Sequence, residues 1–148
     1  MTIGESMRKA RENAGLTLQK LAFFSNLTTS FLSRLERDMF NPNIKKVIEL
    51  SDVIGISIDD YIGRKGYRRN LKTSVKLTTG QSIQRTRESK GISIDKLVEM
   101  TGYEKRELNN WEKDRHSPRL IAVIDIADAL GVSIDELVGH EMKEGAEE

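Results

Sequence analysis

Apolar residues recur at helical spacing in short blocks along the chain. Ile3, Met7 and Ala10 fall on one face of a first segment, and Gly15 follows as a residue that tolerates the left-handed conformation found at helix ends. Thr17 then stands where a second helix needs an N-cap. The pattern therefore predicts two short amphipathic helices near the N-terminus.

The same period continues in the next block. Asn26 tolerates the left-handed region better than most residues, so it suits the end of the second helix. Thr28 can cap a third helix whose inward face holds Leu32 and Leu35. A fourth helix follows Pro42, and a short fifth helix comes after it. This part of the chain is therefore predicted to be all-α.

The pattern returns 76 positions later without a gap. Residues identical at this offset include Gly4, Arg11, Glu12, Gly15, Leu21, Glu36, Asp38, Pro42 and Asp59, which match Gly80, Arg87, Glu88, Gly91, Leu97, Glu112, Asp114, Pro118 and Asp135. A repeat of this length indicates a duplicated domain rather than a solenoid unit. We expect domains at residues 1–63 and 79–139, a basic linker at 64–78 and an acidic tail at 140–148.

Two stretches, "GLTLQKLAFFSNLTTSFLSRLERDMFNPNI" and "GISIDKLVEMTGYEKRELNNWEKDRHSPRL", carry the most specific pattern. In the first, the matching features are Leu21, Ala22, Asn26, Leu32, Ser33, Leu35, Glu36 and Pro42. Their spacing resembles the lambda repressor/Cro-type helix-turn-helix domains, the XRE family, over about 60 residues of each repeat. The resemblance implies two tandem five-helix lambda-repressor-like domains. The chain departs from the family at Leu18 and Ile94, where a phosphate-binding Gln is frequent, and at Asp38 and Asp114, where Gly is usual.

The resemblance also implies a DNA-binding surface. In such domains the second helix of the pair lies in the major groove with its N-terminal side chains near base edges. The positions that correspond to base contacts are Thr28, Thr29, Ser30, Ser33, Arg34, Glu104, Lys105, Arg106, Asn109 and Asn110. Arg and Lys suit guanine, Asn suits adenine, and a Thr methyl group suits the thymine methyl group. The competing interpretation is an ordinary solvated helix face.

Phosphate contacts are expected from the loop after the recognition helix, from helix N-termini and from the linker. The candidates are Arg37, Asn41, Asn43, Lys46, Arg68, Arg69, Lys113, Arg115, His116 and Arg119. The linker supports this role because its local charge is +6, with no acidic residue. Solvated surface is again the competing interpretation for each residue.

Two charged pairs are expected to be structural rather than functional. The resemblance implies that Arg11 pairs with Glu36, and Arg87 with Glu112, as partly buried ion pairs that tie the first helix of each domain to the end of the recognition helix. Removal of one partner would leave an uncompensated charge and destabilise the domain by several kcal/mol.

Four further residues carry structural expectations. Phe23 and Phe24 stand where the family usually has polar residues, so we expect one of them to complete the core and the other to be exposed. Trp111 is expected in the core, and Glu104 is expected to cap the third helix of the second domain.

Composition narrows the class of protein. Hydrophobic residues make up 37% and charged residues 32%, with a net charge of +1, as in a soluble folded protein. Cysteine is absent, and His116 and His140 lie too far apart in sequence to suggest a metal site. No Walker loop, nucleophile elbow or cluster of metal-ligand spacing is present, so we expect no enzyme, no cofactor and no metal. No apolar run approaches the roughly 18 residues of a membrane span, and no secretory signal is visible, so we expect no membrane partner and a cytoplasmic location.

Three functions remain open at this point. The leading hypothesis is a sequence-specific double-stranded DNA-binding protein, a transcriptional repressor whose two domains act as a pseudo-dimer within one monomer, with further self-association left open. The second is a DNA-binding accessory protein of a mobile element such as a conjugative plasmid, because tandem members of the family occur on phages and plasmids. The third is a protein-interaction module on a helix-turn-helix scaffold. Residues 79–139 favour it, because they hold nine basic against eleven acidic residues, and Glu104 and Glu107 would face the phosphates.

Overall fold

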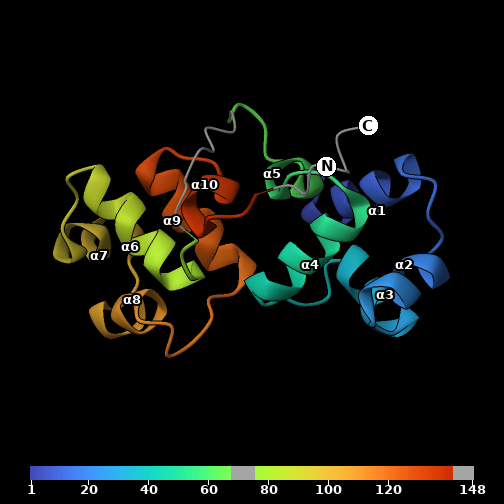
Figure 1. Cartoon of the computed structure of the whole chain (residues 1–148), viewed down its shortest axis with the longest axis horizontal. Coiled ribbons are helices and arrows are strands. Elements are labelled where there is room, and N and C mark those ends of the chain that lie inside the picture. The colour runs from blue at the N-terminus through green and yellow to red at the C-terminus, as the bar shows by residue number, and fades with distance from the viewer. Residues whose placement is uncertain (68–75, 142–148) are drawn as a thin grey trace. The chain divides into compact units, whose positions relative to one another are not determined.

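The computed structural model describes residues 1–67 and 76–141. The chain separates into two compact units, one covering residues 1–66 and the other covering the described part of 67–141. The first unit contains α1 (Ile3–Asn13), α2 (Leu18–Ser25), α3 (Thr29–Glu36), α4 (Ile44–Ile54) and α5 (Ile58–Ile62), drawn from blue to green in Figure 1. The second contains α6 (Thr79–Ser89), α7 (Ile94–Thr101), α8 (Lys105–Glu112), α9 (Leu120–Leu130) and α10 (Ile134–Val138), drawn from yellow-green to red.

Within these residues the regular elements are ten helices, five in each unit, which confirms the predicted all-α tandem fold. None of these helices is both long and apolar enough to cross a membrane.

Side-chain caps begin most of the helices at the predicted places. Thr17 Oγ1 accepts a hydrogen bond from the Lys20 amide at 3.1 Å and so starts α2. Asn26 ends this helix in the left-handed conformation, with a φ angle of 59°. Gly102 ends the equivalent helix α7 in the same region. The cap predicted for Glu104 is wrong, because its side chain makes no capping hydrogen bond; a Glu side chain is longer than the Ser, Thr, Asp and Asn that favour this geometry.

The core of each unit is built from the inward faces of its helices. In the first unit the fully buried side chains include Met7, Leu21, Leu32, Ile44, Val47, Leu50, Ile58 and Tyr61, and in the second they include Ile83, Leu97, Leu108, Leu120, Val123, Ile126, Ile134 and Leu137. Helices α1 and α5 pack together, as do their counterparts α6 and α10. This packing leaves the outward faces of α3 and α8 uncovered by their own units.

Two expectations about aromatic residues are wrong. Phe23 and Phe24 are both exposed, at 81% and 61%, because Leu21 and Ala22 already occupy the inward positions of α2. Trp111 is half-buried rather than in the core. Leu108 fills the inward position of α8, and the Trp111 ring instead packs edge-to-face with the Tyr103 ring at a centroid distance of 5.4 Å.

One buried carboxylate in each unit is paired with a residue just after the last helix. Asp59 Oδ1 accepts a hydrogen bond from Arg64 Nη1 at 2.7 Å. Asp135 Oδ1 lies 2.6 Å from Nδ1 of the buried His140. The predicted boundaries place Arg64 in the basic linker and His140 in the acidic tail, but both side chains contact the helices that they follow.

Candidate nucleic-acid interface

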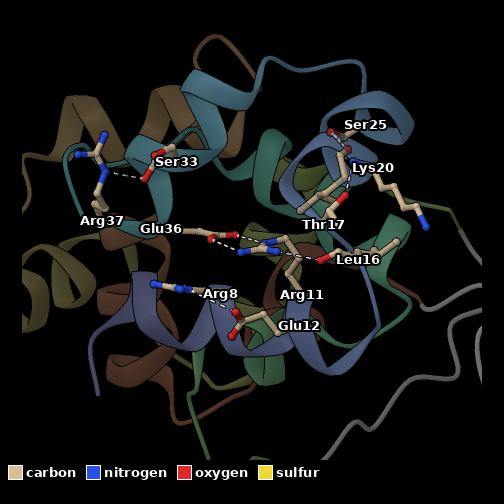
Figure 2. Close-up of polar contacts among 11 residues, drawn as sticks. Arg8, Arg11, Glu12, Leu16, Thr17, Lys20, Ser25, Ser33, Glu36 and Arg37 are labelled. Atoms are coloured by element: carbon tan, nitrogen blue, oxygen red, sulfur yellow. Dashed lines mark hydrogen bonds and ion pairs between the residues drawn. The ribbon is translucent and has the colours of Figure 1, made fainter.

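The recognition helix α3 is fixed to α1 by a buried ion pair. Arg11 Nε and Nη2 donate to Glu36 Oε2 and Oε1 at 2.8 and 3.0 Å, and Arg11 Nη1 donates to the Leu16 carbonyl at 2.8 Å (Figure 2). These hydrogen bonds with Glu36 raise the pKa of Arg11 above the usual value for arginine. The equivalent pair of Arg87 and Glu112 ties α8 to α6 at 2.7 and 2.9 Å. Both predicted ion pairs are confirmed.

A second tie explains why aspartate stands where the family usually has glycine. Asp38 and Asp114 adopt φ angles of 59° and 58° directly after the recognition helices. Their Oδ1 atoms accept hydrogen bonds from the backbone amides of Gly4 and Gly80 at 2.8 and 2.9 Å. A Cβ atom at either glycine would collide with the backbone at the end of the recognition helix. Each carboxylate therefore lies at the N-terminus of α1 or α6, where a negative charge is favourable, and holds that end against the end of α3 or α8.

The predicted base-contacting residues of the first domain lie on one face of α3 and at its N-cap, Thr28. Thr28, Thr29, Ser30 and Arg34 are exposed, and Ser33 is half-buried. Thr28 Oγ1 accepts a hydrogen bond from the Phe31 amide at 3.0 Å, so this oxygen already caps the helix. The methyl group and the hydroxyl hydrogen of Thr28 remain for a ligand.

Arg34 has an aromatic support that the sequence did not reveal. Its Cζ atom lies 5.9 Å from the centroid of the Phe40 ring, within the range of a cation–π interaction. Phe40 in turn packs edge-to-face on Phe31 at 5.0 Å. The two rings limit where the guanidinium group can lie. In the sequence, the only sign that position 40 has a role at this surface is that Phe40 aligns with His116, which is a predicted phosphate contact.

The predicted phosphate contacts of the first domain follow α3 and surround the start of α4. Arg37 is exposed, and its Nε donates to the Ser33 carbonyl at 3.3 Å (Figure 2). Asn43 caps α4, because its Oδ1 accepts a hydrogen bond from the Lys45 amide at 2.9 Å. Lys46 pairs with Glu49 at 3.5 Å, both partly exposed, so a phosphate would compete with a weak surface ion pair.

In the second domain the predicted residues gather around one shallow concavity of about 640 Å³. It is lined by Lys105, Arg106, Asn109, Asn110, Lys113, Arg115 and His116. The structure thus brings together four predicted base contacts and three predicted phosphate contacts. Glu104 and Arg119 are not among the lining residues, although both are exposed in the same domain.

Local contacts orient two side chains of this concavity. Lys105 Nζ lies 3.1 Å from Asp95 Oδ1 on α7, an acidic neighbour that the sequence did not reveal; both side chains are largely exposed, so this is a weak surface ion pair. Arg115 Nη1 donates to Asn110 Oδ1 at 3.4 Å, which leaves the amide nitrogen of Asn110 as a donor. Arg68 and Arg69 lie outside the described residues.

Both surfaces are rich in groups that can form hydrogen bonds with a nucleic acid. They present hydrogen-bond donors, amides and positive charge, which suit phosphate oxygens and base edges. Within residues 1–67 and 76–141, no three His, Cys, Asp or Glu side chains are placed to hold a metal ion together.

Comparisons with known proteins agree with this arrangement. A helix-turn-helix family model matches residues 7–61 and again residues 83–137. The HTH-type transcriptional regulator ImmR of Bacillus subtilis (strain 168) is 26% identical over 122 residues, which are 82% of this chain and 86% of ImmR. The immunity repressor protein of Bacillus phage phi105 is 31% identical over 65 residues, which are 44% of this chain and 45% of the repressor. The chain thus spans less than half the length of the phage protein. It belongs to the helix-turn-helix family of the lambda repressor/Cro type, with two such domains in tandem.

Proposed function

We propose that the chain is a sequence-specific double-stranded DNA-binding protein that represses transcription. The observation that carries this proposal is the pair of uncovered recognition helices, each rigidly held in its own domain and each lined by base-compatible side chains. The relatives support a regulatory role, because one is named an immunity repressor and another a transcriptional regulator. A repressor must also be present where the DNA is transcribed, which favours a cytoplasmic location.

We propose further that the two domains act as a pseudo-dimer within one chain. Single-domain proteins of this fold pair up to meet two half-sites about 34 Å apart. Here each chain already has two recognition helices, α3 and α8, with the same internal supports. Each domain would place the N-terminal part of its recognition helix in the major groove, and the loop before α4 or α9 would contact phosphates.

Selection from a random pool of DNA duplexes tests this function with the full chain at physiological salt. A defined enriched motif is the expected result. Weak, sequence-independent enrichment would favour an accessory protein that coats DNA, and recovery of no duplex would favour a protein-interaction module, to which the acidic Glu104 and Glu107 point. Both outcomes contradict the repressor.

A matched pair of variants connects the binding to α3. Arg34→Ala should weaken binding to the selected site about 5- to 150-fold, as expected for loss of one two-pronged contact to a base. Arg8→Ala is the control, because Arg8 is also an exposed arginine but lies on α1, where it pairs with Glu12 (Figure 2). Native mass spectrometry on a short duplex gives the stoichiometry, and two chains per site would contradict the pseudo-dimer.

A further inference from the structure

The two domains hold their recognition helices in the same way. Helices α3 and α8 each have eight residues and begin at positions that differ by the repeat offset. The buried arginine–glutamate pairs have closest distances of 2.8 and 2.7 Å, and the aspartate–glycine ties measure 2.8 and 2.9 Å. Equivalent positions on α3 and α8 therefore present their side chains in the same direction within their own domains.

The side chains presented in this way differ at every predicted base-contacting position. The equivalent pairs are Thr28 and Glu104, Thr29 and Lys105, Ser30 and Arg106, Ser33 and Asn109, and Arg34 and Asn110. The buried positions of the same two helices include identical pairs, Leu32 with Leu108 and Glu36 with Glu112. The two helices are thus alike at buried positions that hold them in place and different at the positions predicted to contact bases.

The first face has small hydroxyl side chains and one arginine. Thr28 and Thr29 present methyl groups, which suit the thymine methyl group. Arg34, placed beside the Phe40 ring, is the long donor of this face and suits the two acceptors of guanine.

The second face has amides and flanking charges. Asn109 and Asn110 both line the concavity, and asparagine suits the adenine edge. Lys105 lies beside Asp95, whereas Arg106, the other long basic side chain of this face, has no acidic partner within the described residues. The outward face of α8, with its amides, and that of α3, with its methyl groups and single arginine, therefore favour different base pairs.

The loops that follow the recognition helices differ as well. Met39 and Phe40 in the first domain stand where Arg115 and His116 stand in the second. Met39 is exposed and apolar, whereas Arg115 lines the concavity beside the predicted base contacts. The loop after α8 therefore has more positive charge with which to hold phosphates than the loop after α3.

We infer that the preferred DNA site consists of two unlike half-sites, one read by each domain, rather than two copies of one sequence. This inference rests on the proposed function. A dimer of identical domains must select two copies of the same half-site, but one chain with two different faces has no such constraint.

The selected motif tests the inference apart from the function on which it depends. We expect two blocks of sequence that are neither inverted nor direct copies of each other. Two copies of one block would overturn the inference and leave the DNA-binding function intact. A single block would also overturn it, because only one domain would then read sequence. Failure to enrich any motif would instead reject the proposed function itself.

A graft variant of the full chain gives a sharper outcome. Giving α8 the outward residues of α3, through E104T, K105T, R106S, N109S and N110R, should convert the second block into a copy of the first. The control exchanges Gln81→Glu and Arg85→Lys on α6, which copy exposed residues of α1 and should leave the motif unchanged. An unaltered second block in a folded graft variant overturns the inference.

Single substitutions keep the inference testable if the graft variant does not fold. Asn110→Ala should relax the preference at one base pair by about 5- to 150-fold, and Arg34→Ala should do so at another base pair in the other block. Relaxation of the same position, or of symmetry-related positions with the same base, would overturn it.

Discussion

Replacing Glu112 by Gln should destabilise the second domain by about 3–5 kcal/mol. The substitution keeps the shape of the side chain and removes its charge. Arg87 and Glu112 have side chains only 10% and 6% exposed, and Arg87 donates to both carboxylate oxygens and to the Ile92 carbonyl. The variant therefore leaves a buried guanidinium group facing a neutral amide, whose NH₂ group cannot accept a hydrogen bond.

The single tryptophan of the chain makes this loss measurable in one domain. Trp111 precedes Glu112 on α8, so its fluorescence reports the unfolding of the second domain in urea. A domain of this size has an m-value of about 1 kcal/mol per molar urea, so the midpoint should fall by about 3–5 M or to the start of the titration.

The first domain supplies the matched control for the assay. Glu36→Gln breaks the equivalent pair there, and it should lower the stability seen by circular dichroism without moving the Trp111 midpoint. Replacing both partners with apolar residues, as in Arg87→Met with Glu112→Leu, should recover most of the stability. A loss below about 1 kcal/mol for Glu112→Gln, as for an exposed ion pair, would refute the reasoning.

Four other measurements probe the structure. Tyr61→Phe should be neutral or stabilise the first domain by about 1 kcal/mol in chemical unfolding, because Tyr61 is fully buried and, within the described residues, its hydroxyl group has no hydrogen-bond partner. Asp38→Ala should cost about 1–3 kcal/mol in the same assay, since alanine keeps the strained left-handed backbone and loses the hydrogen bond to the helix N-terminus. Burial and the hydrogen bond to Asp125 raise the pKa of Tyr103 to about 12. The stability that Tyr103 contributes should therefore be complete below pH about 10 and lost as the pH rises through about 12. In a spectrophotometric titration, Asp125→Asn should lower this pKa. DNA affinity should fall about 10³- to 10⁵-fold between 50 and 200 mM salt if about 6–10 phosphates are contacted, and an affinity that barely changes would contradict the electrostatic argument.

The sequence predicted the helices well because their ends depend on local chemistry. Thr17 and Asn26 act within a few residues of themselves, so the cap and the left-handed turn were visible without the fold. The repeat added a second, independent copy of each signal, and the buried arginine–glutamate pairs followed from the family resemblance.

Features that depend on three-dimensional neighbours were not predictable in the same way. Phe23 and Phe24 are apolar, and only the packing of α2 shows that both lie outside the core. The contact of Arg34 with Phe40 depends on how the loop after α3 folds back, and the pairing of Lys105 with Asp95 joins two helices across a turn. The base and phosphate assignments remain predictions, because they concern a partner rather than the chain itself.

The side-chain contacts that Asp59 and Asp135 make with residues just after α5 and α10 determine where the chain can be cut. Ending a fragment at residue 63 or 139 would remove Arg64 or His140 and take a partner from the buried carboxylate of Asp59 or Asp135. Dissection of the protein into single domains should therefore retain these two residues, or a loss of binding would report unfolding instead of the missing second domain. The same boundary shortens the tether between the domains to residues 65–77, which span at most about 45 Å when fully extended. Half-sites much more than one or two helical turns apart would then exceed the reach of a single chain.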